Sequence, residues 1–171
     1  MDISVLVEQL SGELDDQAFK ASDLLAQKNS TEVVSEMVKL LEHSNDESKI
    51  LAARTLGLIE SNSEALDALL EAIDKNPKIA GELLVHLDGF DLSEKYVALF
   101  KLSLFGSFKV SSVAQDLLDH KEFNITPRVL KKAKKAWHHY ENNVKHDELF
   151  DLKKMEVEEL LADLQSFIDS E

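Results

Sequence analysis

Apolar residues recur along this chain at the spacing of a helix that buries one face. Between residues 31 and 44 they fall at Val33, Val34, Met37, Leu40 and Leu41. This is the i, i+3, i+4, i+7 pattern of a helix packed on a core. No stretch shows the strict alternation of a half-buried strand, and no Asn-Gly hairpin turn occurs. The pattern predicts an all-α protein.

Four segments open in a similar way and mark the start of a recurring helix. They begin at Thr31, Ser63, Ser93 and Thr126, so the intervals between them are 32, 30 and 33 residues. Each hydroxyl can accept a hydrogen bond as an N-cap, and the acid or proline that follows suits the first helical position. The spacing predicts a helical repeat with a period of about 31 residues.

A second set of helices lies between these openings and has its own common pattern. A lysine is followed by a β-branched residue, by a small residue at the third position and by leucine at the ninth. The three sets are Lys49, Ile50, Ala52 and Leu58; Lys78, Ile79, Gly81 and Leu87; and Lys109, Val110, Ser112 and Leu118. Small residues allow close helix approach and the larger ones supply buried area, as stacked hairpins require.

These signals predict a single domain over residues 1–171. It comprises an N-terminal helix pair within 1–30, repeats over 31–143 and an acidic C-terminal cap or tail over 147–171. The expected fold is a right-handed α-α superhelix of antiparallel helix hairpins with a C-terminal capping helix. The predicted helices are 2–11 and 13–28; 31–44 with 46–60; 63–75 with 77–89; 93–105 with 109–121; 126–143; and 154–169.

Residues 46–57, with the sequence DESKILAARTLG, resemble the HEAT-repeat superfamily. An acidic turn is followed by a basic residue, paired alanines and then Leu-Gly. Lys49 stands where arginine is more usual, and the other predicted units keep the periodicity but lose the motif. The resemblance covers about residues 31–143. It implies a curved stack of helix pairs that engages a protein or a nucleic acid.

Composition and charge narrow the function classes. The chain has no cysteine, which excludes disulfides and thiolate chemistry, and a formal net charge of −14, which disfavours general binding to nucleic acid. No signal peptide or membrane-spanning stretch is evident, so we expect a cytoplasmic protein without membrane contact.

The charge is unevenly distributed along the chain. From Lys121 to His146 there are seven basic residues against two acidic ones, although the remainder is strongly acidic. The helix predicted at 126–143 supplies the candidate binding strip, which comprises Arg128, Lys131, Lys132, Lys134, Lys135, Trp137, His138 and His139. The helix is interpreted as burying an apolar stripe behind a solvated basic back, and that stripe comprises Val129, Leu130, Ala133, Ala136, Trp137 and Tyr140. The alternatives are a nucleic-acid contact with Trp137 or Tyr140 at its edge, or a dock for an acidic segment of the same or another chain.

The acidic segment 147–171 follows directly and carries an apolar face at helical spacing. That face comprises Val157, Leu160, Leu161, Leu164, Phe167 and Ile168. The segment is expected either to cap the last hairpin, which would otherwise expose apolar area, or to act as a helical ligand for another groove.

Phenylalanines beside glycines at predicted hairpin turns are secondary candidates for a partner surface. They are Phe90, Phe105 and Phe108, and joint exposure of Phe105 and Phe108 would move the expected interface to them. No catalytic, cofactor or metal site is expected, because the six histidines lack zinc-site spacing and no phosphate-binding loop or nucleophile elbow occurs.

The sequence therefore predicts a non-enzymatic protein-interaction module or adaptor whose protein partner and oligomeric state are unknown. The alternative is a nucleic-acid-binding HEAT-like protein of the DNA-lesion-recognition type, which would use the basic 126–143 helix. A third hypothesis, a small lyase-type enzyme, rests on the resemblance alone.

Overall fold

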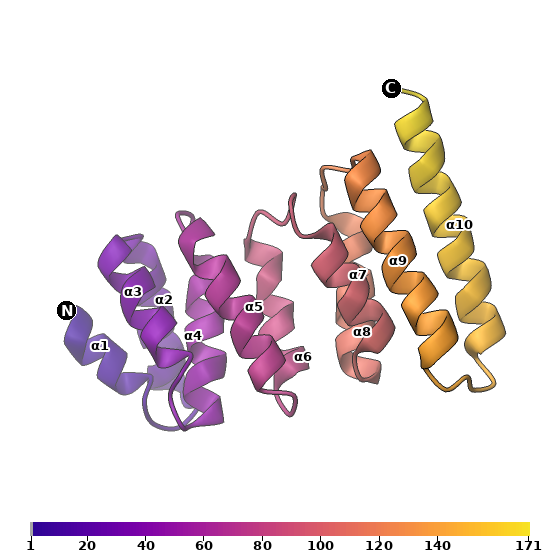
Figure 1. Ribbon diagram of the computed structural model, residues 1–171. Helices are drawn as coiled ribbons and strands as arrows, with labels where there is room; N and C mark the ends of the chain where they lie inside the picture. Colours follow the sequence, from indigo (N-terminus) through magenta and orange to yellow (C-terminus); the bar gives the residue numbers. More distant parts are fainter. Residues whose placement is uncertain (1) are drawn as a thin grey trace. The chain divides into compact units, whose positions relative to one another are not determined.

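The computed structural model describes residues 2–171, and over that range the chain forms helices and turns without a strand. The chain divides into two compact units, one ending at Asp91 and the other spanning Leu92–Glu171. The prediction of an all-α protein is confirmed, and the helices are consistent with an α-α solenoid. Figure 1 shows their order along the chain. The right-handed twist and the capping role of the last helix stay predictions.

The N-terminal unit contains four helices of ten residues or more, α2 to α5, together with shorter segments. They are α1 (Ile3–Gln9), α2 (Asp16–Lys28), α3 (Thr31–Leu40), α4 (Asp46–Leu58), the 3-10 turn η1 (Ser63–Ala65), α5 (Leu66–Lys75), α6 (Ala80–Leu84) and the 3-10 turn η2 (Val85–Gly89). Their inward faces are lined by fully buried leucines and alanines, including Leu25, Leu51 and Leu56. Burial of this apolar area is the main stabilising term of the unit.

Hydrogen bonds join successive helix pairs of the N-terminal unit at separations close to the predicted period. Their partners are 32 or 33 residues apart: Leu14 N donates to Glu47, Ser61 N donates to Asn29, and the Ser22 and Thr55 hydroxyls lie 2.7 Å apart. These separations are close to the predicted period of about 31 residues, although the bond from Asn62 to Gly89 spans 27 residues.

Two glycines allow α4 and η2 to approach closely. A Cβ atom at position 89 would lie 2.6 Å from the carbonyl carbon and 2.9 Å from the Cα atom of Gly57. A Cβ atom at position 57 would lie 2.7 Å from the carbonyl oxygen of His86. The neighbouring Asn62 side chain is buried and donates to the carbonyl oxygens of Leu56 and Gly89, at 2.8 and 3.0 Å. The two backbones are therefore packed in direct contact.

The C-terminal unit is formed by four helices, α7 (Tyr96–Phe105), α8 (Phe108–His120), α9 (Pro127–Asn143) and α10 (Phe150–Asp169). Helix α7 packs against both α8 and α9, and α10 packs along α9. The core joins Phe100 and Leu104 of α7 to Trp137 of α9 and to Val157 and Leu161 of α10. The apolar face predicted for segment 147–171 is thus used within this unit.

Only one of the four predicted N-caps has the predicted role. Thr126 accepts a hydrogen bond from Val129 N at 3.2 Å, and Pro127 occupies the first helical position. Ser30, not Thr31, caps α3, where it accepts from Val33 N. Ser63 lies within η1, and α7 begins only at Tyr96, three residues after Ser93. A hydroxyl at the right interval does not fix a helix start, because neighbouring turns compete for it.

Two predicted helices also have different bounds. The helix predicted at 77–89 is split into α6 and the 3-10 turn η2, in a segment where Asp88 and Gly89 are poor helix formers. The helix predicted from residue 154 begins at Phe150, because the Asp147 carboxylate accepts a hydrogen bond from Leu149 N and starts the turn early.

Candidate functional site

The basic residues of the candidate strip lie on the exposed face of α9. Arg128, Lys131, Lys132, Lys134 and Lys135 are all exposed, as are His138 and His139. Within residues 2–171, none of the five cations is held in an ion pair, and Lys134 donates to Gln165 of α10 at 3.1 Å. The strip therefore presents exposed positive charge rather than a preformed set of ion pairs.

The two large rings predicted at the edge of the strip are not available to a ligand there. Trp137 is only 6% exposed and its ring stacks on Phe150 of α10 with centroids 6.1 Å apart. The ring of Tyr140 stacks on that of Trp137, with centroids 5.6 Å apart. The inclusion of Trp137 in the binding strip is corrected on this ground, because base stacking requires an accessible ring face.

The three rim phenylalanines have different environments. Phe90 is 2% exposed, which corrects its proposed place on a rim, since a buried ring offers a partner no surface. Phe105 is 45% exposed, and the centroid of its ring lies 5.8 Å from that of His139 and 5.5 Å from that of Tyr140. Phe108 is 92% exposed at the start of α8. Phe105 and Phe108 are thus exposed together, and this is the condition under which the expected interface moves to them.

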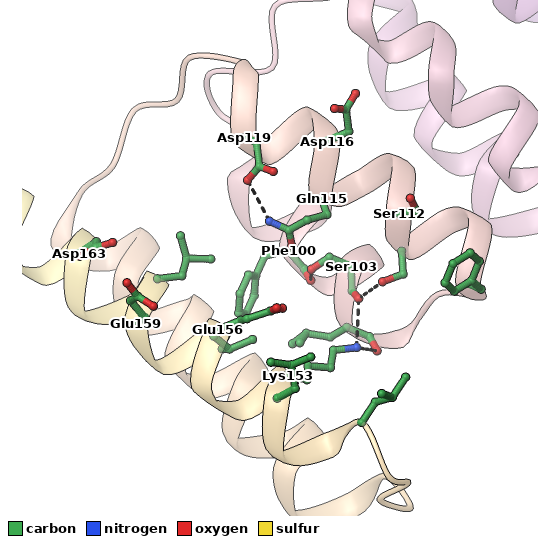
Figure 2. A pocket seen from close by; sticks show the side chains of 17 residues that line it. Phe100, Ser103, Ser112, Gln115, Asp116, Asp119, Lys153, Glu156, Glu159 and Asp163 are labelled. Atoms are coloured by element: carbon green, nitrogen blue, oxygen red, sulfur yellow. Dashed lines mark hydrogen bonds between the residues drawn. The ribbon is translucent and has the colours of Figure 1, made fainter.

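A groove of about 860 Å³ runs beside Phe108 between α8 and α10. Side chains from one face of α8 and one face of α10 form its walls, and Phe100, Ser103 and Leu104 of α7 lie between them (Figure 2). The α8 wall runs from Phe108 to Asp119 and the α10 wall from Leu149 to Asp163. The whole groove therefore lies within the C-terminal unit. We call it the α8–α10 groove.

Carboxylates dominate the charge of the α8–α10 groove. Its walls carry Asp116, Asp119, Glu156, Glu159 and Asp163. The groove contains one basic side chain, Lys153, whose Nζ lies 3.4 Å from the carbonyl oxygens of both Ser103 and Leu104. That ammonium is directed at the C-terminal end of α7, where the helix dipole favours a cation. The five carboxylates are therefore not neutralised inside the groove.

The groove is apolar at one end and acidic at the other. Because Lys153 near the start of α10 reaches Leu104, which lies just before the start of α8, the two helices begin at the same end and run in the same direction. Phe108, Leu149 and Leu152 gather at that end, each more than half exposed. Asp119 and Asp163 lie at the other end, as Figure 2 shows.

The acidic end also affects a buried side chain of α7. Tyr96 is buried, and this burial, together with the negative charge of Asp119, raises the pKa of its phenol to about 12. No hydrogen-bond partner for its hydroxyl lies within residues 2–171. The phenol therefore stays neutral across the physiological range and contributes packing rather than chemistry.

The α8–α10 groove was not among the sites predicted from the sequence, although a signal for it was present. On α10, Leu149, Leu152, Glu156, Leu160 and Asp163 recur at intervals of three and four, so they share one face. The same holds for Phe108, Ser112, Gln115 and Asp119 on α8. The apolar face predicted for segment 147–171 shares only Leu160 with this second face.

Among the described residues, no group of three or more histidine, aspartate or glutamate side chains is placed to hold a metal ion. None of the helices over residues 2–171 is long and apolar enough to cross a membrane.

Comparison with known proteins gives one result. Residues 3–81 match the family model described as HEAT repeats, which is slightly less than half of the chain. The match includes the N-terminal helix pair, so it begins earlier than the repeat array predicted over 31–143 and ends before α7. No curated protein and no solved structure gives a significant match.

Proposed function

We propose that the protein is a non-enzymatic protein-interaction module, because its residues 3–81 match the family model of HEAT repeats. HEAT repeats commonly mediate protein interactions, and that general role is the starting point. The finer proposal is that the partner binds the C-terminal unit, at the α8–α10 groove and the neighbouring phenylalanines Phe105 and Phe108.

The observation that carries this proposal is the exposure of Phe108 and its neighbours. A phenylalanine that is 92% exposed gives up most of the stabilisation that burial would bring. Leu149 and Leu152 lie beside it in the groove, at 67% and 55% exposure. Single exposed apolar residues are ordinary, but several large ones lining one groove are typical of an interaction surface.

The proposal predicts that Phe108→Ser abolishes capture of the partner. Affinity capture from cell lysate, followed by quantitative mass spectrometry, should recover at least one protein with the wild type. Its recovery should fall by about tenfold or more with the variant, because central aromatic anchors dominate interface energies. Phe167→Ser is the matched control, since Phe167 is also exposed but lies outside the groove. If every captured protein is recovered equally with Phe108→Ser, the proposed surface is wrong.

Nucleic-acid binding through the basic residues of α9 is the second candidate function, supported by their exposure and lack of ion pairs. We expect no such binding, because the net charge is −14 and the Trp137 ring is buried. The check is a fluorescence-anisotropy titration of labelled single-stranded and duplex DNA. Four phosphate contacts would weaken the affinity about a hundredfold between 50 and 200 mM salt. Such a salt dependence, removed by Lys131→Gln with Lys135→Gln, would support the second candidate instead.

A further inference from the structure

The walls of the α8–α10 groove are complementary to a partner of positive charge. Among the described residues, Glu156, Glu159 and Asp163 of α10 take part in no ion pair, and Asp116 has only His120 within ion-pair distance, at 3.8 Å. Asp119 accepts a hydrogen bond from the neutral amide of Gln115 at 3.0 Å. The Lys153 ammonium is held by α7 carbonyl oxygens rather than by these acids. A cationic partner could therefore pair with these carboxylates without first breaking salt bridges to lysine or arginine.

The dimensions of the groove fit a short helix. At 1.5 Å per residue, the α8 wall from Phe108 to Asp119 is about 17 Å long and the α10 wall from Leu149 to Asp163 is about 21 Å long. A helix of about 12 to 15 residues spans the same length. Its side chains could enter between the two walls in the way that neighbouring helices pack, with ridges in grooves.

Other recognition modes fit less well. Recognition by β-strand addition needs an open sheet edge, and the described part of the chain has no strand. Nucleic acid would bring phosphates to a row of carboxylates. A second copy of this chain could offer the cations of α9, but the apolar side of that helix, including Leu130 and Trp137, is already buried in its own unit. A second copy would therefore supply the charge without the apolar anchors.

We propose that the α8–α10 groove binds a basic amphipathic helix from another protein. Apolar side chains of that helix would cover Phe108, Leu149 and Leu152, and its lysine or arginine side chains would lie against the acids towards Asp119 and Asp163. This inference rests on the proposed function and adds the chemical class of the partner.

The test uses three fluorescein-labelled 15-residue peptides and the full-length protein, with fluorescence anisotropy as the readout. The first peptide has leucine at helical spacing and lysine elsewhere, the second has glutamate in place of lysine, and the third distributes the same leucines and lysines around the whole helix. We expect the first peptide to bind at least tenfold more tightly than either of the others. Equal binding of the first and third peptides would overturn the proposal, since charge alone would then suffice.

Protein variants locate the binding site. A variant that combines Glu156→Gln, Glu159→Gln and Asp163→Asn should bind the first peptide about tenfold more weakly. The reason is that it loses three ion pairs with the peptide, each of modest strength. The matched control is Glu13→Gln with Glu60→Gln and Glu64→Gln, which removes the same charge from exposed positions of the N-terminal unit and should change the affinity less than twofold. An equal effect of the two triple variants would overturn the proposal.

The result separates this inference from the proposed function. If the first peptide does not bind but Phe108-dependent capture of a protein persists, the interaction surface stands and the class of partner is wrong. If neither is observed, both fail. If sedimentation shows self-association that Phe108→Ser abolishes, the occupant is a second copy and the amphipathic-helix proposal is overturned.

Discussion

Replacing Phe100 with alanine should lower the free energy of unfolding of the C-terminal unit by about 4 kcal/mol. Phe100 is 1% exposed and its ring stacks near that of Tyr96, with centroids 6.1 Å apart. It also belongs to the cluster that joins α7 to α9 and α10. Truncation removes most of the buried area of the ring and leaves a cavity that rigid neighbouring helices fill only in part.

A loss of this size is large for the unit concerned. A unit of 80 residues, Leu92–Glu171, has a stability of roughly 4–12 kcal/mol at ordinary values per residue. Urea denaturation followed by Trp137 fluorescence is the measurement, because the chain has a single tryptophan and it is buried in this same cluster. Phe108→Ala is the matched control, because the same atoms are removed from a ring that is 92% exposed. We expect the control to change stability by less than about 0.5 kcal/mol, and equal effects would contradict the described core.

Replacing Gly89 with alanine is expected to destabilise the N-terminal unit by about 3 kcal/mol, the upper part of the usual range for overpacking. The added methyl group would overlap the backbone of Gly57, which cannot rotate away as a side chain would. Helix α4 and η2 would have to separate, and this would weaken the two hydrogen bonds that Asn62 donates across them. Thermal unfolding followed by far-UV circular dichroism measures the effect.

Gly12→Ala is the control for the glycine substitution. No atom outside its immediate neighbours lies within 4 Å of a Cβ atom built at position 12, so the same methyl group has room there. Alanine also reduces the conformational entropy of the unfolded chain, so the control should be neutral or slightly stabilising. A Gly89→Ala variant as stable as Gly12→Ala would show that the close approach of α4 and η2 is not required for folding.

The periodic apolar pattern was sufficient to predict the fold class, because several helices bury one face only. The α3 stripe that ends at Leu40 is a clear example, and α5 and α9 have the same one-sided burial, whereas apolar residues surround α7 more evenly. Helix starts were predicted less well. The N-cap role of Thr126 was correct, but that of Ser93 was not, because whether a hydroxyl caps a helix depends on local turn geometry.

The candidate site was predicted only in part. Phe105 and Phe108, the two rim phenylalanines predicted from their neighbouring glycine, are both exposed. The burial of Trp137 agrees with the apolar stripe predicted for the 126–143 helix, and it leaves no ring face for a ligand of the binding strip. The α8–α10 groove depends on two helices about 40 residues apart in sequence running in the same direction, and no local pattern fixes that arrangement.

The separation of apolar and acidic residues along the α8–α10 groove has a kinetic consequence. Asp119 lies in the last turn of α8, so the negative end of that helix dipole reinforces a field that already belongs to a chain of net charge −14. A cationic partner would be drawn to that end during diffusional encounter, and ionic strength would then act chiefly on the association rate. The lifetime of the complex would depend instead on Phe108, Leu149 and Leu152, whose contacts form last and must all be broken before release.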